Sequence, residues 1–190
     1  MIPLATAQNT GTPVLSRPQA DAFSKKVDTI VAQAAARQGT PGSKRTTVTE
    51  GEVNSWFAFR AQPLLPAGMT EPSVSALGNN RVSGRAIVDL DAVSKRKSTG
   101  GTLDPWSFIG GKVPLTVTGT LQTMNGVAKF DLESAQVSAV PVPKFLLQEL
   151  LTFYSRSPKN PDGVSLDDSF QLPANIRQID IGQGQAVVIQ

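Results

Sequence analysis

The sequence contains no cysteine and no histidine, and these two absences remove much of the usual chemistry of enzymes. Without cysteine there is no disulfide, no thiol nucleophile, no thiolate metal ligand and no acylated lipoprotein cysteine. Without histidine the chain lacks the commonest metal ligand and the usual acid–base group at neutral pH. It also has no Walker A, G-x-S-x-G or HExxH motif. We therefore expect a protein that is not an enzyme and that needs no metal or cofactor.

Charged residues are scarce as well, at 17% of the chain, and the formal net charge is only +3. So small an excess does not favour nucleic acid as a partner. Long apolar runs are also missing, because none approaches the roughly 20 residues of a transmembrane helix. The 190 residues fit one domain, which we place at residues 17–190.

Residues 1–16 are expected to be disordered or to be the remnant of a signal peptide. Ala5-Thr6-Ala7 resembles the A-x-A end of a secretory signal, although the charged and apolar regions that precede such a site are missing. This fragment predicts export to the periplasm or the extracellular space. The alternative is a flexible tail that begins at an added methionine.

Two helices are predicted in the first third of the chain. Ser16 as N-cap and Pro18 in the first turn begin a long amphipathic helix that extends to Gln38. The spacing Thr49-x-x-Glu52 is typical of a capping box and predicts a short second helix over about Glu50–Arg60. The long helix either lines an apolar tunnel or packs on a sheet in the ordinary way.

Alternating apolar and polar residues then predict a meander of antiparallel hairpins. The expected strand pairs are Ser73–Leu77 with Arg81–Val93, Val113–Gln122 with Val127–Val140, and Ile176–Ile181 with Ala186–Ile189. Asn125-Gly126 is a strong two-residue turn signal. The apolar phase shifts after Leu132, which predicts a β-bulge and a strongly curved sheet. Gly84 and Ala86 leave space on the apolar face, as glycine does at a bend or beside a ligand.

The segment Pro143–Ser157 predicts a second apolar helix near the C-terminus. Its polar residues form one narrow stripe, and almost every other position is apolar. Such a helix needs cover on two sides, either from protein or from a bound apolar ligand.

A basic run followed by aromatic residues suggests contact with a membrane. Lys95, Arg96 and Lys97 precede a glycine-bounded segment that carries Trp106 and Phe108, and this combination suits transient docking to an anionic lipid surface. The alternative is that the aromatic rings tuck back as a lid or core plug and the charges are solvated.

The order of these elements resembles the tubular lipid-binding (TULIP) superfamily, in its bacterial single-domain branch of LmeA-like and periplasmic lipoprotein-like proteins. The resemblance rests on Glu52-Val53-Asn54 in the short helix, Pro141-Val142-Pro143 before the apolar helix, and Leu172-Pro173 before the last hairpin. It implies an α+β fold with a strongly curved antiparallel sheet wrapped around the long N-terminal helix. It also implies an apolar groove that binds a hydrophobic lipid.

The function expected from the sequence is thus lipid binding or lipid shuttling by an exported protein. Its alternative is a structural or scaffold protein with a filled core that binds a protein partner; an enzyme using Ser-Lys or paired carboxylates is the least favoured. A homodimer is compatible with the sequence. The residues expected to line the groove are Phe23, Val27, Ile30, Val31, Trp56, Phe57, Leu115, Val117, Phe130, Leu132, Phe145, Leu146, Leu150 and Phe153.

Overall fold

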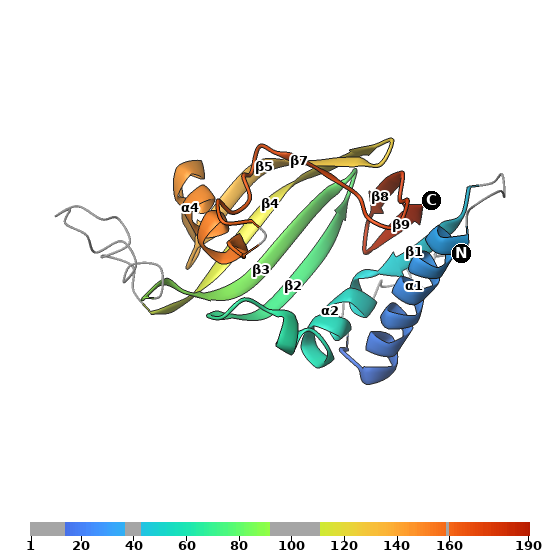
Figure 1. Cartoon of the computed structure of the whole chain (residues 1–190). Coiled ribbons are helices and arrows are strands. Elements are labelled where there is room, and N and C mark those ends of the chain that lie inside the picture. The colour runs from blue at the N-terminus through green and yellow to red at the C-terminus, as the bar shows by residue number, and fades with distance from the viewer. Residues whose placement is uncertain (1–13, 37–42, 92–110, 159) are drawn as a thin grey trace, which may run out of the picture.

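The computed structural model describes residues 14–36, 43–91, 111–158 and 160–190 (Figure 1). Its described elements are α1 (Arg17–Ala36), β1 (Arg45–Thr49), α2 (Glu50–Phe59), η1 (Gln62–Leu64), β2 (Met69–Gly78), β3 (Arg81–Asp89), β4 (Lys112–Met124), β5 (Val127–Val137), β6 (Val140–Pro141), α4 (Lys144–Ser155), β7 (Ser169–Gln171), β8 (Gln178–Gly182) and β9 (Gln185–Ile189).

The large sheet is an antiparallel meander with strand order β2-β3-β4-β5-β6, and β7 pairs with the start of β5. A second, three-stranded antiparallel sheet has the order β1-β9-β8. The α+β class and the meander of hairpins are therefore confirmed. None of the helices in the described ranges is long and apolar enough to span a membrane.

Two tight turns set the register of the large sheet. Asn79 and Asn80 take φ of 52° and 59°, and Asn125 and Gly126 take 52° and 85°. Positive φ at both central residues is the type I′ geometry, whose twist matches that of the flanking strands. Both turns lie where the sequence predicts them.

The predicted bulge is present in β5. Thr118 pairs with Ser134 while its neighbour Gly119 pairs with Leu132, so Glu133 is the extra residue. A second irregularity lies in β2 between Thr70 and Ser73, where Glu71 has φ of 51°. Because bulges bend and twist strands, both contribute to the shape of the sheet.

Several predicted boundaries were wrong. The strand expected to run to Val140 ends at Val137, because Ser138 and Ala139 take φ of 51° and 66° and turn the chain into β6. The apolar helix ends at Ser155 rather than Ser157. At the other side of the sheet, β2 begins at Met69 rather than Ser73, and β3 ends at Asp89 rather than Val93.

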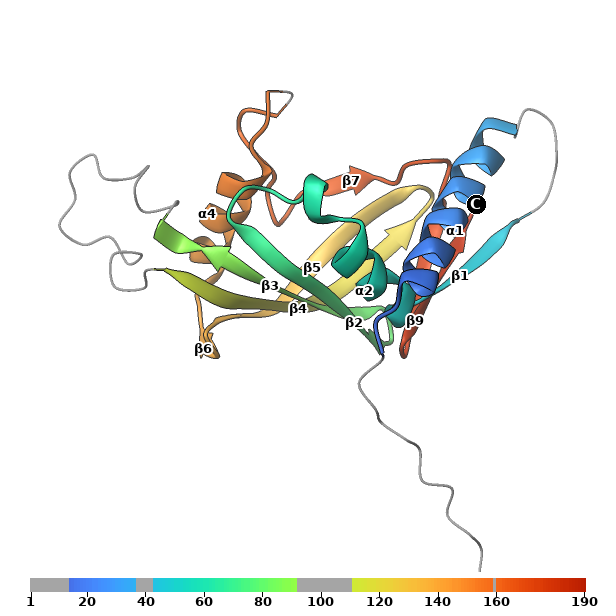
Figure 2. The ribbon, with the colours of Figure 1, turned by 90° about the horizontal axis from the view of Figure 1, so that it is seen from below.

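The helix α1 lies beside α2 and β1, at the opposite end of the molecule from α4 (Figures 1 and 2). Its Lys26 Nζ lies 2.7 Å from Glu52 Oε1 of α2. The carbonyl of Ile30 accepts a hydrogen bond of 2.9 Å from Gln190 Nε2, directly after β9. Since these contacts join α1 to α2 and the small sheet, the wrapping of the large sheet around α1 stays a prediction.

Candidate functional site: an apolar groove on the large sheet

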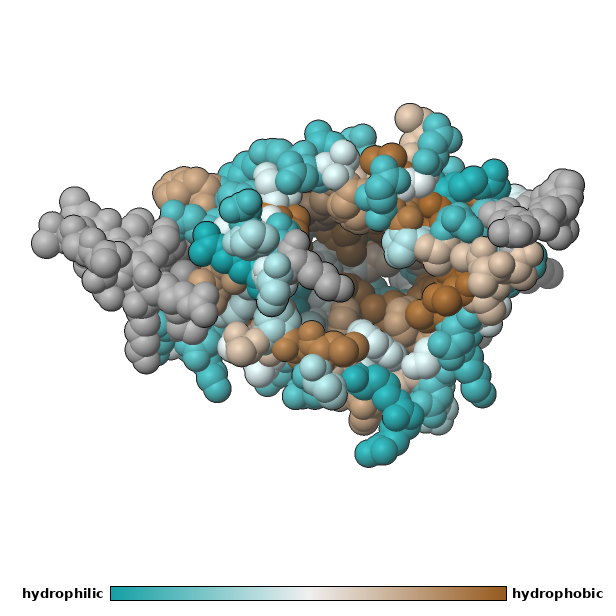
Figure 3. Space-filling view, in the orientation of Figure 1, coloured by the Kyte–Doolittle hydropathy of each residue, from teal (hydrophilic) through white to brown (hydrophobic). Residues whose placement is uncertain are grey.

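One face of the large sheet is apolar across four strands, and this face carries the candidate site. The register places Val117 of β4 between Gly84 of β3 and Ala135 of β5, and Leu115 between Ala86 and Val137. Side chains alternate between the two faces of a strand, so these residues share one side. Figure 3 shows that the molecule is hollowed on this side and that apolar residues gather in the hollow.

At one end, α4 closes this face with leucine side chains. Leu146 and Leu150 pack with Val88, Leu90 and Val137 in a cluster whose members are all buried. Burial of this kind removes apolar area from water at about 25 cal/mol per Å². The end beneath α4 is therefore a filled core.

Tyr154 fixes the position of α4 on the sheet. Its hydroxyl donates to the carbonyl of Asp89 at 2.9 Å and accepts from the backbone N–H of Asp89 at 3.1 Å. Burial raises the pKa of the Tyr154 hydroxyl, against the lowering effect of its backbone hydrogen bond. The hydroxyl thus stays protonated and keeps both bonds.

The middle of the same face is open. A groove of about 250 Å³ lies here between α2 and strands β2 to β4. A Cβ atom built on Gly84 would meet nothing within 4 Å, so this glycine faces empty space. Val117 and Leu115 are only partly buried. The residues that line the groove are Phe57, Pro72, Ser73, Val74, Gly84, Arg85, Ala86, Leu115 and Val117.

Polar contacts at the edge of the sheet hold α2 over this groove. The Asn54 side chain donates to the carbonyl of Val74 and accepts from its N–H, both at 2.8 Å. Glu50 Oε2 accepts from the N–H of Ala76 at 2.9 Å. The short helix thereby satisfies backbone groups on the outer edge of β2, which would otherwise lack a partner.

The predicted capping box of α2 is confirmed and is tied to α1. Thr49 Oγ1 accepts from the N–H of Glu52, and Glu52 accepts from the N–H of Thr49. Burial alone would raise the pKa of the Glu52 carboxyl, but hydrogen bonds from Lys26 and Thr49 outweigh this effect and lower it. The carboxylate is thus held ionised between the two helices.

Phe130 of β5 lies on the same face of the sheet, nearer to the β4–β5 turn than the groove. A Cβ built on Gly119 would lie 2.5 Å from Phe130 Cζ and still closer to the carbonyl oxygen of Asp131. The aromatic ring therefore occupies the space above Gly119, the next residue after Val117 on this face. Only glycine fits beneath it.

The structure brings some of the expected lining residues together and separates others. Phe57, Leu115 and Val117 line the groove. Phe130 and Leu132 are half-buried on the same face of the sheet. Leu146 and Leu150 belong to the filled core, and Phe153 packs against it. Phe145 is 59% exposed.

The expected lining residues of α1 and α2 are more dispersed. Phe23 and Trp56 contact each other, with ring centroids 5.6 Å apart. Ile30 is buried, whereas Val27 and Val31 are 40% and 56% exposed. The residues expected to dock on a membrane, Lys95, Arg96, Lys97, Trp106 and Phe108, lie outside the described residues, as does Ala5-Thr6-Ala7.

Reasoning from the sequence missed the contribution of β2 to the groove. Pro72 and Val74 line it because the bulge at Glu71 shifts the register of this strand. The signal was Glu71-Pro72, since proline within a strand marks an edge or a bulge.

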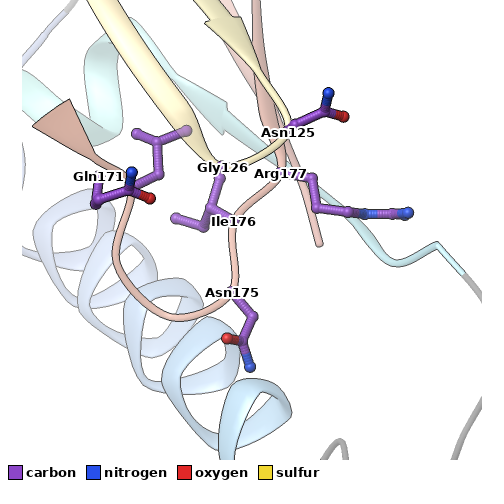
Figure 4. A pocket seen from close by; sticks show the side chains of 7 residues that line it. Asn125, Gly126, Gln171, Asn175, Ile176 and Arg177 are labelled. Carbon is purple, nitrogen blue, oxygen red and sulfur yellow. The ribbon is translucent and has the colours of Figure 1, made fainter. Parts of the chain in front are cut away.

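A second pocket, of about 400 Å³, lies between the β4–β5 turn and the loop before β8 (Figure 4). Its polar side chains do not converge, because Asn125 and Arg177 point away from it. Asn175 Nδ2 instead donates to the carbonyl of Ala34 at 3.2 Å. Within the described ranges no three acidic side chains gather as a metal site would require.

These features define an α+β protein with an open apolar groove on one face of an antiparallel sheet. Comparison of the chain with known protein families, curated proteins and solved structures finds no match.

Proposed function

We propose that this chain is a lipid-binding or lipid-shuttling protein that holds an acyl chain or another hydrophobic ligand in the groove. The observation that carries the proposal is the open middle of the apolar face, where Gly84 faces empty space and Leu115 and Val117 are only partly buried. Apolar side chains left in contact with water in a groove are the usual sign of a site that another molecule covers.

The chemistry of the lining favours a hydrocarbon ligand. Apart from Ser73 and Arg85, every lining residue is apolar or glycine. Covering such a surface contributes about 25 cal/mol per Å² without any directed hydrogen bond, so affinity would depend on chain length more than on head group.

The resemblance to the TULIP superfamily supports the same function. As part of the proposal, the curved sheet and the helical layer together enclose the ligand, and the protein works after export to the periplasm or the extracellular space. Transient contact with a membrane surface would let it collect and release its lipid.

Native mass spectrometry of the purified protein, followed by organic extraction, tests the proposal directly. We expect a bound mass that organic solvent releases as a lipid. A protein that carries no lipid and also fails to bind a fluorescent fatty acid would overturn the proposal in favour of a scaffold.

A pair of charge substitutions on one strand locates the site. Val117→Asp places a carboxylate in the groove, whereas Thr116→Asp places one on the opposite face of the same strand, because successive side chains of a strand alternate between its faces. We expect Val117→Asp to abolish fatty-acid binding and Thr116→Asp to retain it, with circular dichroism checking that both fold. Gly84→Leu provides an uncharged test, since its side chain would fill the groove. Unchanged binding in folded Val117→Asp and Gly84→Leu would show that the ligand lies elsewhere.

A further inference from the structure

The ring of Phe130 lies beside the groove, over strand β4. On β4 the groove is lined by Leu115 and Val117, and the next residue on that face is Gly119. The ring of Phe130 lies directly over Gly119, with Cζ 2.5 Å from where a Cβ would be. One position beyond Val117, the space over this face of β4 is therefore taken up by the Phe130 ring and the backbone of Asp131.

The apolar face continues on the far side of this ring. Val82 pairs with Gly119, Leu121 pairs with Phe130, and Leu132 faces Gly119 from β5. Val82, Leu121 and Leu132 are all only partly buried. Val82 and Leu132 therefore lie level with Gly119, on the strands at either side of it, and Leu121 continues the half-buried apolar face beyond Gly119.

We infer that Phe130 is the end wall of the groove and sets the length of the hydrocarbon chain that the protein accepts. This inference rests on the proposed function. A straight chain lying along β4 past Leu115 and Val117 would meet the ring edge, and further methylene groups would have to bend out into water. Two residues of a strand span about 7 Å, so removing the ring opens room for several more methylene groups.

Chain-length dependence of affinity reports the position of such a wall. Each methylene group that enters the groove should increase affinity by about fourfold, and each one beyond the wall should add little. Wild-type protein titrated with saturated straight-chain fatty acids of increasing length should show a steep rise and then a plateau. The length at which the plateau begins measures the distance to the wall.

Shortening the side chain at position 130 tests the inference. Phe130→Ala should shift the onset of the affinity plateau to longer fatty acids, and Phe130→Leu should shift this onset less. Lys129→Ala, on the exposed opposite face of the same strand, is the matched control and should leave the onset unchanged. Phe130→Leu also serves as the readout if the alanine variant does not fold.

The outcomes separate the inference from the function on which it rests. An unchanged onset in folded Phe130→Ala or Phe130→Leu, with fatty acids still bound, would overturn the end wall and leave the carrier function intact. Absence of fatty-acid binding in wild-type protein would overturn the proposed function itself.

Discussion

The two parts of the apolar face differ in how their covering helix is held. At one end α4 inserts Leu146 and Leu150 into the face, and the result is a filled core whose central residues are all buried. In the middle, Asn54 and Glu50 hold α2 at the edge of β2 by hydrogen bonds to its backbone. These contacts do not bury the apolar surface of the sheet beneath α2. Phe57 then borders a groove that stays open.

This difference shows how one sheet can serve both stability and binding. A helix that is held by the burial of its apolar side chains covers the part of the sheet to which it is attached. A helix attached by directed hydrogen bonds at a sheet edge can stand over an apolar surface without filling it. We therefore expect substitutions beneath α4 to change the free energy of unfolding, and substitutions in the groove to change ligand binding.

The largest expected effect comes from Leu150→Ala, compared with Val117→Ala. Leu150 is 1% exposed within the filled core, so its truncation should lower the free energy of unfolding by about 2–5 kcal/mol. Val117 faces the groove, and its truncation should cost about 1 kcal/mol or less. Chemical denaturation measures both values.

Fatty-acid affinity should show the reverse order, provided that it is measured where both variants are folded. Val117→Ala should weaken binding more than Leu150→Ala does. Equal destabilisation by the two substitutions would mean that the middle of the face is as well filled as the end beneath α4.

The two glycines of the apolar face give the next contrast. At Gly119 an added Cβ meets the Phe130 ring and the backbone of Asp131, so Gly119→Ala should destabilise the protein by about 1–3 kcal/mol. At Gly84 the added methyl meets nothing, and alanine reduces the entropy of the unfolded chain. Gly84→Ala should therefore be neutral or stabilising by up to about 1 kcal/mol. Thermal unfolding measures the change in stability of both variants. A loss of stability in Gly84→Ala would contradict the open groove.

Much of the fold could be predicted from local sequence signals. Asn125-Gly126, the capping box at Thr49 and Glu52, and the phase shift after Leu132 each act through neighbouring residues, and each is confirmed. The turn at Ser138 and Ala139 could not be predicted, because neither residue favours positive φ and only pairing with the rest of the sheet places them there.

The candidate site was less accessible to sequence reasoning. An apolar pattern predicts that a side chain faces away from water. It does not predict whether other residues of the protein pack against that side chain or whether the side chain borders a groove. Val137 and Val117 both belong to alternating strand patterns, yet Val137 lies in the filled core and Val117 borders the groove. The distinction depends on where α2 and α4 cross the sheet, which is a long-range property.

An effect of similar size to that of Gly119→Ala is expected at the polar attachment of α2. Asn54→Ala leaves the N–H and carbonyl of Val74 without their partner and should cost about 1–3 kcal/mol. Hydrogen exchange should accelerate at the amides of residues 73–78 and stay unchanged in α4. Gln62→Ala, exposed beside the same helix, is the control. Equal acceleration in both regions would show that the two covers are not independent.

The smallest expected effect is a pH dependence at the contact between α1 and α2. The pKa of Glu52 is lowered from its usual 4.5 by its bonds to Lys26 and Thr49, so the ionised form stabilises the fold. This contribution is complete above pH 4.5 and is lost as the pH falls through the lowered pKa of the folded state. Glu52→Gln preserves a residue suited to the capping box but removes the charge, and should cost about 1 kcal/mol or less at neutral pH.

The deficit of Glu52→Gln relative to wild type should shrink as acid neutralises the wild-type carboxylate, and Lys26→Met should follow the same profile because it breaks the same ion pair. The loss caused by Leu150→Ala should stay constant over that range, since no charge takes part in its packing. A deficit of Glu52→Gln that does not change with pH would mean that the ion pair with Lys26 contributes nothing to holding α1 and α2 together.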